Sequence, residues 1–192
     1  MLKIKMADVL ILLRRFREAN SILDEAKLLD HRDINLYILK TEIFLALERP
    51  EEAVLVRDES LELFEGEERI ELLFEMADVF DDYEEYERVF ECIREVLIAE
   101  PTNEEALYKV CFWTDFTGRN EEGIRLHMEI LEDHPYSELA WFNLGAAYQG
   151  LKLYEKAIDA YQYAIVIEEK FDYAYRNMGD ALIRLRRYKE AL

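Results

Sequence analysis

The stretch that decides the fold is WFNLGAAYQGLKLYEKAIDAYQYAIVIE, residues Trp141–Glu168. At 3.6 residues per turn, its apolar residues gather on one helical face before Gly150 and on another after Leu153. The Gly150–Leu153 segment between them is typical of a short turn. The stretch therefore predicts two amphipathic helices joined by a tight connection.

The same pattern recurs along the whole chain. The small residue in the middle of the second helix has equivalents at intervals of 34, 36, 34, 34 and 34 residues: Ala19, Ala53, Val89, Gly123, Ala157 and Ala191. Two other registers keep the same intervals: Phe16, Pro50, Tyr86, Asn120, Tyr154 and Tyr188, and Leu10, Phe44, Phe80, Thr114, Tyr148 and Leu182. Three registers that agree over six copies indicate a repeat protein.

This repeat resembles the tetratricopeptide repeat. The resemblance is carried by Trp141, Leu144-Gly145 and Tyr148 in the first helix, and by Ala157, Tyr161 and Ala164 in the second. It implies an all-α fold, a right-handed α-α superhelix (a solenoid) of about five full helix-turn-helix repeats plus a truncated sixth. We expect one solenoid domain over residues 1–192, with repeats at about 1–33, 34–69, 70–103, 104–137 and 138–171 and a partial repeat at 172–192. Pro101 and Pro135 end two of these repeats.

Some positions depart from the pattern. The second repeat has two extra residues, which we place in a loosened turn at Glu65–Glu68 around Gly66. Lys40, Arg57 and His127 stand where an apolar residue is expected.

The end of the chain also departs from a complete repeat. Leu192 falls about halfway along the second helix of the sixth repeat, so Ala181, Leu182 and Leu185 are expected to be poorly covered. This predicts either a fragment of a longer protein or a homo-oligomer formed through the open C-terminal end.

Composition excludes several classes of protein. The net charge is −19, and the segment from Asp58 to Glu91 holds fifteen acids against Arg69 and Arg88. Such a surface repels phosphate, so nucleic acid is not an expected partner. No apolar run approaches the ~20 residues of a membrane helix, so we expect no membrane partner. Cys92 and Cys111 have no metal or disulfide spacing, which suits two core residues in a cytoplasmic protein.

The sequence lacks the parts of an enzyme. No HExxH, GxSxG, phosphate-binding loop or dinucleotide fingerprint occurs, and the three histidines, His31, His127 and His134, are spread over two turns and a helix. We expect no catalytic residue, no metal site and no cofactor.

Binding is the better expectation. In the tetratricopeptide family the first helix of each repeat forms the concave wall. Transferring that register gives three columns: Ile38, Phe74, Tyr108, Phe142 and Arg176; Leu39, Glu75, Lys109, Asn143 and Asn177; and Glu42, Asp78, Phe112, Ala146 and Asp180. The first is rich in aromatics, which give large contact area at low entropy cost. The second carries amides, which pair with both groups of a peptide backbone.

The resemblance thus predicts a peptide-binding site of Phe74, Tyr108, Lys109, Phe142, Asn143, Arg176 and Asn177. The other interpretation is that the aromatics pack between helices and the asparagines face water. Family members that bind chaperone tails use a clamp of Lys and Asn for a terminal carboxylate, and only Lys109, Asn143, Arg176 and Asn177 offer part of it here. The acidic middle of the chain favours a partner with basic residues.

The expected function is a non-enzymatic protein–protein interaction scaffold whose concave face binds an extended or helical segment. Two alternatives stay open: a self-associating structural solenoid, and the regulatory portion of a larger protein.

Overall fold

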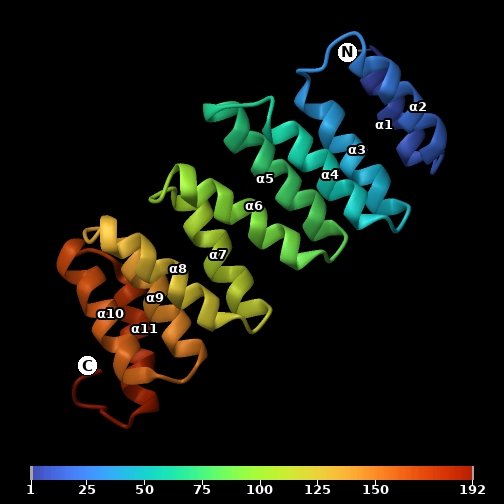
Figure 1. Ribbon diagram of the computed structural model, residues 1–192. Helices are drawn as coiled ribbons and strands as arrows, with labels where there is room; N and C mark the ends of the chain where they lie inside the picture. Colours follow the sequence, from blue (N-terminus) through green and yellow to red (C-terminus); the bar gives the residue numbers. More distant parts are fainter. Residues whose placement is uncertain (1, 192) are drawn as a thin grey trace. The chain divides into compact units, whose positions relative to one another are not determined.

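A computed structural model describes residues 2–191 (Figure 1). Over this range it contains eleven helices and no strand. The helices are α1 (Leu2–Leu12), α2 (Phe16–Lys27), α3 (Ile34–Ala46), α4 (Pro50–Leu61), α5 (Gly66–Asp82), α6 (Tyr86–Ala99), α7 (Glu104–Phe116), α8 (Asn120–Asp133), α9 (Glu138–Gly150), α10 (Tyr154–Ile167) and α11 (Asp172–Arg184). The predicted all-α repeat fold is confirmed.

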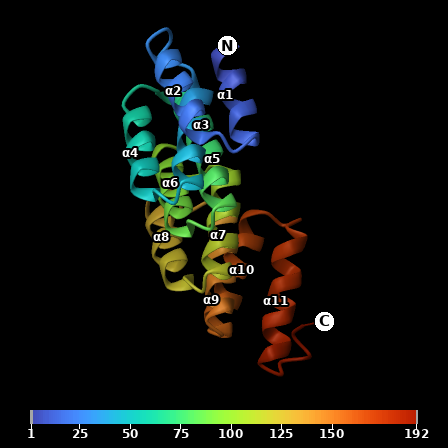
Figure 2. The same cartoon turned by 90° about the vertical axis from the view of Figure 1, so that its right-hand side faces the viewer.

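The helices form two compact units, one ending at Ile93 and the other beginning at Arg94. In the first unit, α1 packs on α2 and α3 on α4, while α3 also contacts α1 and α5. In the second, α9 packs on α10 and also on α7 and α8, and α11 packs on α10 (Figures 1 and 2). Helices that are first in their pairs therefore lie beside one another within each unit, as a repeat fold requires.

One backbone motif joins the two helices of each pair. After each first helix a single residue has a positive φ: Arg14, Glu48, Glu84, Gly118, Lys152 and Arg186. The next residue donates its N–H across six residues, for example from Leu153 to the carbonyl of Tyr148 at 2.9 Å. Lys152 N–H also bonds the carbonyl of Gln149 at 2.9 Å, which completes a Schellman turn. These turns recur with the same intervals as the sequence registers.

Short polar residues start several of the first helices. The side chains of Asp33, Asn103 and Ser137 accept hydrogen bonds from the backbone N–H groups of Asn35, Ala106 and Ala140. Each satisfies a donor that the helix itself leaves unpaired. The caps fix where successive repeats begin.

Gly145 is needed for close packing of one pair. A Cβ added there would lie 2.6 Å from the ring of Tyr161, which is fully buried on α10. The small residue on α9 thus lets a large aromatic side chain of the same helix pair fill the space between the two helices.

The extra residues of the second repeat lengthen a helix. Gly66, at φ +58°, is the first residue of α5, and Glu67 and Glu68 lie in its first turn. With 17 residues α5 is longer than its neighbours α3 and α4, which have 13 and 12. The expected loosened turn at Glu65–Glu68 is therefore wrong. Acidic residues are favourable near a helix N-terminus, which explains the earlier start.

The prediction for the chain end is also wrong in two respects. The segment 185–191 forms turns, and no second helix begins within these described residues. Ala181 and Leu182 are not poorly covered: they are buried with Ile158, and Met178 and Ala191 pack against them.

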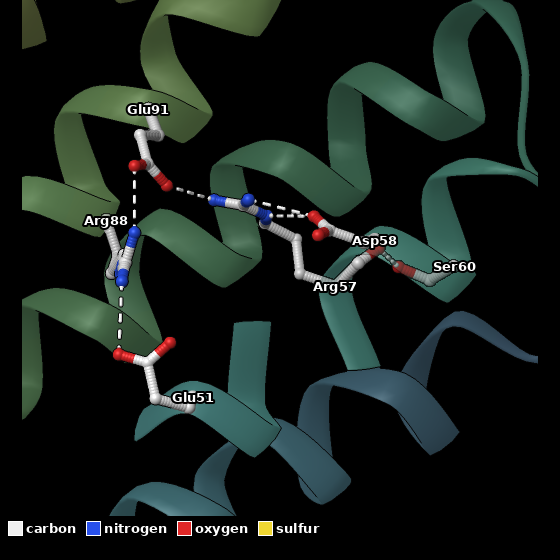
Figure 3. Close-up of polar contacts among 6 residues, drawn as sticks. All are labelled: Glu51, Arg57, Asp58, Ser60, Arg88 and Glu91. Carbon is white, nitrogen blue, oxygen red and sulfur yellow. Dashed lines mark hydrogen bonds and ion pairs between the residues drawn. The ribbon is translucent and has the colours of Figure 1, made fainter. Parts of the chain in front are cut away.

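Arg57 occupies a position where the repeat pattern has an apolar residue, and its side chain forms ion pairs with acidic residues (Figure 3). Its guanidinium donates to Glu91 of α6 at 2.7 Å and to the adjacent Asp58 at 2.8 Å. Arg88 joins Glu91 to Glu51 of α4 by ion pairs of 2.9 and 3.5 Å. Burial acts to lower the pKa of Arg57, but its bonds to Glu91 and Asp58 raise it. An ion-pair network thus replaces apolar packing between α4 and α6.

Within the described part of the chain, no helix is long and apolar enough to span a membrane.

Candidate functional site

A groove of about 680 Å³ lies in the second unit. Most of its wall comes from α7, α9 and α11, the first helices of three successive pairs. Its lining residues are Tyr108, Cys111, Phe112, Asp115, Phe116, Asn120, Phe142, Asn143, Ala146, Gln149, Gly150, Lys152, Tyr154, Tyr161, Asn177, Asp180 and Arg184. Seven of these residues belong to the columns predicted for the concave wall: Tyr108, Phe112, Phe142, Asn143, Ala146, Asn177 and Asp180.

One wall of the groove is aromatic. Tyr108, Phe112 and Phe116 follow one another at four-residue spacing on α7, so they form a stripe along the helix. Their side chains are 70%, 50% and 61% exposed. The rings of Phe112 and Phe116 are nearly parallel, with centroids 6.0 Å apart. Aromatic rings this exposed on one stripe provide a large apolar contact area for a ligand.

Phe142 continues the apolar surface on α9, where it is half-buried. Its ring lies 5.7 Å from the ring of Tyr161 and 5.0 Å from the ring of Phe171. These contacts hold the Phe142 side chain in place at the groove wall.

The floor of the groove is polar. The hydroxyl of Tyr161 donates to Oε1 of Gln149 at 3.1 Å, and Nε2 of Gln149 donates to Asp180 at 3.3 Å. Asp180 also lies 3.7 Å from the guanidinium of Arg184. These contacts link α9, α10 and α11 by a chain of side chains.

Burial and nearby carboxylates change the ionisation of two residues of the groove lining, Tyr161 and Cys111. Burial raises the pKa of Tyr161, a hydrogen bond with Asn177 lowers it, and the charges of Asp180 and Asp115 raise it further. Burial, with a smaller effect of Asp115, raises the pKa of Cys111 to about 12. Cys111 is therefore a neutral thiol at physiological pH. The charged residues of the groove lining are the acids Asp115 and Asp180 and the bases Lys152 and Arg184.

Four of the seven predicted site residues line this groove: Tyr108, Phe142, Asn143 and Asn177. Lys109 and Arg176 do not line it. The ammonium of Lys109 lies 3.8 Å from Glu105, and the guanidinium of Arg176 stacks over Tyr173 at 5.3 Å. Phe74 is a half-buried residue of α5 in the first unit.

Asn143 is already bonded inside the protein. Its side chain is buried, and its Nδ2 donates to the carbonyl of Leu107 at 3.0 Å, which ties α9 to α7. Asn177 is half-buried, and its side chain forms a hydrogen bond with Tyr161. The four residues named for a partial carboxylate clamp are thus divided, with two amides at the groove and both cations, Lys109 and Arg176, outside its lining.

Sequence reasoning missed several lining residues, although the signal was present. One further helical turn along the predicted columns leads from Phe112 to Asp115 and Phe116, from Ala146 to Gln149, and from Asp180 to Arg184. Tyr161 was named only as part of the repeat pattern of the second helix and not as a site residue; in the structure it also lines the groove.

The second unit has another depression, of about 360 Å³, between α8, α9 and α10. It is lined by Met128, Leu131, Glu132, Trp141, Leu144, Tyr148, Lys156, Asp159, Ala160 and Tyr163. The rings of Trp141 and Tyr163 stack there at 4.4 Å. It is about half the volume of the groove.

The first unit carries most of the negative charge. Its first helices bring acids together: burial raises the pKa of Glu42, and the charges of Asp8 and Asp82 add to this. Among residues 2–191 no cluster of His, Cys, Asp and Glu side chains has a geometry that would hold a metal ion.

Comparisons with known proteins agree with this architecture. Residues 139–171 match the family model of the tetratricopeptide repeat. The chain is similar in structure to residues 41 to the end of MamA from Desulfovibrio magneticus RS-1, with a TM-score of 0.53 and 23% identity over 82% of this chain and 88% of that one. An ArsTM double mutant of MamA RS-1 gives a TM-score of 0.54 and 22% identity with the same coverage.

A further MamA crystal structure gives a TM-score of 0.53 and 19% identity over 82% of this chain and 85% of that one. At this level of identity the similarity shows a shared fold. No curated protein sequence gives a significant match. The chain therefore carries a tetratricopeptide repeat at residues 139–171, and it has the all-α repeat fold of which that repeat is the unit.

Proposed function

We propose that this chain is a non-enzymatic protein-interaction scaffold, and that the groove of its second unit binds an extended segment of another protein. The observation that carries the proposal is the aromatic stripe of Tyr108, Phe112 and Phe116, three large exposed side chains on the wall of a groove. Such an apolar surface is unfavourable in water, and contiguous exposed apolar surface on a protein marks an interaction site.

The groove suits a peptide in its polar groups as well. Asn177 and Gln149 place side-chain amides on the same surface, and an amide both donates to and accepts from a peptide backbone. The aromatic wall supplies contact area with little loss of side-chain entropy, because each ring has two rotatable bonds. The combination favours a segment whose backbone is extended and whose side chains include large apolar residues.

The charge of the chain selects the partner. The net charge is −19, and residues 2–93 contribute most of it. A basic partner is therefore steered toward this protein at low ionic strength. We expect the association rate of a basic partner to fall as salt is added. A rate unchanged by salt would disprove charge steering but would not affect the proposal that the groove binds a segment.

The test is a pull-down from a cell lysate with the wild-type chain and with a Tyr108→Ala plus Phe142→Ala variant. We expect the specific partners of the wild type to be lost. Because Phe142 also packs on Tyr161, a second variant, Tyr108→Ala plus Phe112→Ala, changes only exposed groove residues. Tyr136→Ala plus Tyr188→Ala, which removes two exposed aromatics outside the groove, is the matched control. Recovery of the same proteins by all variants would disprove the groove assignment.

A further inference from the structure

Two carboxylates from different helices share the floor of the groove. Asp115 lies on α7 and Asp180 on α11, and both line the groove. Both act on the hydroxyl of Tyr161, since the negative charge of each disfavours its ionisation. The two carboxylates therefore share one groove lining with Tyr161, and both are close enough to Tyr161 to affect its ionisation.

Contacts within the protein leave these carboxylates with acceptor capacity. Asp115 accepts one long bond of 3.4 Å from Nδ2 of Asn120. Asp180 accepts from Gln149 at 3.3 Å, and its pair with Arg184 is loose, at 3.7 Å between side chains that are 46% and 61% exposed. A carboxylate offers about four acceptor sites, and an exposed ion pair this long adds little stability.

The aromatic wall complements these charges. A cation is attracted to the face of an aromatic ring, and the aliphatic part of a Lys or Arg side chain packs well along such rings. Tyr108, Phe112 and Phe116 provide such faces on the helix that also carries Asp115. An acidic side chain placed between Asp115 and Asp180 would instead meet two like charges, and the bases Lys152 and Arg184 of the lining would be its alternative partners.

We propose that the groove contains a subsite for a Lys or Arg side chain of the bound segment, with its stem against Phe112 and Phe116 and its cation between Asp115 and Asp180. This deepens the proposed function and rests on it. Arg184 competes for the subsite, because its guanidinium is the group of the protein that lies beside Asp180. Substitutions at Asp115 and at Arg184 therefore change affinity in opposite directions.

The experiment starts from short random peptides displayed on phage and selected on the full chain. We expect the enriched peptides to carry a Lys or Arg next to large apolar residues. One of them is synthesised together with a neutral twin, in which acetyllysine replaces Lys or citrulline replaces Arg. We expect the twin to bind about tenfold more weakly to the wild type.

Three variants then locate the effect. Asp115→Asn weakens the basic peptide several-fold and leaves the neutral twin unchanged. Arg184→Gln strengthens the basic peptide. Glu129→Gln, an exposed acid of α8 outside the groove, serves as the charge-matched control and changes neither. Circular dichroism of each variant establishes that it is folded.

The outcomes separate the two proposals. If peptides lose affinity on Tyr108→Ala plus Phe112→Ala but bind equally well with and without the cation, the subsite is disproved and the groove stands. If the cation matters but Glu129→Gln weakens binding as much as Asp115→Asn, the attraction is a general surface effect and the subsite is again disproved. If no selected peptide depends on the groove aromatics, the proposed function fails and the subsite fails with it.

Discussion

At the scale of single residues, the turns between paired helices contain backbone strain that a glycine would relieve. Over the described residues, five of the six Schellman turns place a residue other than glycine at positive φ, and Gly118 is the exception. A left-handed conformation costs a residue with a side chain roughly 1–2 kcal/mol. Glycine avoids this cost but loses more chain entropy on folding, so replacing such a residue by glycine gains only part of it.

We therefore expect Glu84→Gly and Lys152→Gly each to raise the free energy of unfolding by about 0.5–1 kcal/mol. Gly118→Ala lowers it by a similar amount, since φ there is +71°. Urea denaturation followed by circular dichroism measures all three. A loss of stability in both glycine variants would show that the turn side chains contribute contacts that outweigh the strain.

His127 gives a second residue-scale prediction. It is fully buried in α8, neither ring nitrogen has a hydrogen-bond partner among the described residues, and burial lowers its pKa to about 4. An unfolded chain has a histidine pKa near ~6.5. Between these pH values the unfolded state binds more protons, so the stability due to neutral His127 is complete above about pH 6.5 and falls as the pH drops toward about 4.

His127→Leu removes this dependence. We expect the variant to lose less stability than the wild type between pH 7 and pH 4, with a difference of up to about 3 kcal/mol. The substitution also removes two buried polar atoms, the ring nitrogens of His127, that have no hydrogen-bond partner among the described residues. Denaturation at a series of pH values tests this, with His134→Gln, an exposed histidine, as the control. Parallel pH profiles for wild type and His127→Leu would mean that His127 is not buried neutral in solution.

At the scale of helices, close approach depends on the small residues that the repeat pattern names. Gly145 of α9 faces the ring of Tyr161 on α10, with 2.6 Å between the position of a Cβ and the ring carbons. We expect Gly145→Ala to lower the free energy of unfolding by about 1–3 kcal/mol because the ring must shift. Gly179→Ala, whose Cβ would meet no atom closer than 4.0 Å, is the matched control and raises stability by about 0.5–1 kcal/mol, because Ala is more favourable than Gly in a helix interior. Equal effects of the two would contradict the packing described.

The helices show how much the sequence predicts. Three registers locate the helix pairs, and the columns transferred from the tetratricopeptide family include Tyr108, Phe142, Asn143 and Asn177 of the groove. Periodicity works here because a repeat fold is made of local contacts between neighbouring pairs. It does not reveal that Asn143 bonds the carbonyl of Leu107, since that contact depends on the distance between two helices.

Other features lie beyond periodicity for different reasons. The early start of α5 depends on Glu67 and Glu68 in its first turn, which a repeat template reads as loop. The role of Arg57 depends on Glu91, 34 residues later, so neither residue alone signals the pair. The floor residues Asp115 and Gln149 were missed because the predicted columns stopped one helical turn too early.

At the scale of the whole molecule, charge dominates. With a net charge of −19, acidic side chains of the folded chain repel one another. Glu42 is one site of this repulsion, because burial and the charges of Asp8 and Asp82 raise its pKa. Salt screens such interactions over about 10 Å at 0.1 M and about 3 Å at 1 M.

We expect the melting temperature to rise by roughly 3 °C when sodium chloride is increased from low to molar concentration, which corresponds to about 1 kcal/mol. Glu42→Gln gives part of this gain without salt and shows a smaller response to it. Differential scanning calorimetry of both proteins provides the measurement. A melting temperature that falls with salt would mean that the ion pairs between helices outweigh the repulsion.

The central claim is that the groove of the second unit binds another chain, and photo-crosslinking tests it most directly. A selected peptide that carries a benzoylphenylalanine is irradiated with the full chain, and the attached residues are identified by mass spectrometry. Our account predicts attachment to α7, α9 and α11, around Tyr108, Phe142 and Asn177. Attachment to the smaller depression around Met128, Trp141 and Tyr163, or to the helices of the first unit, would contradict it.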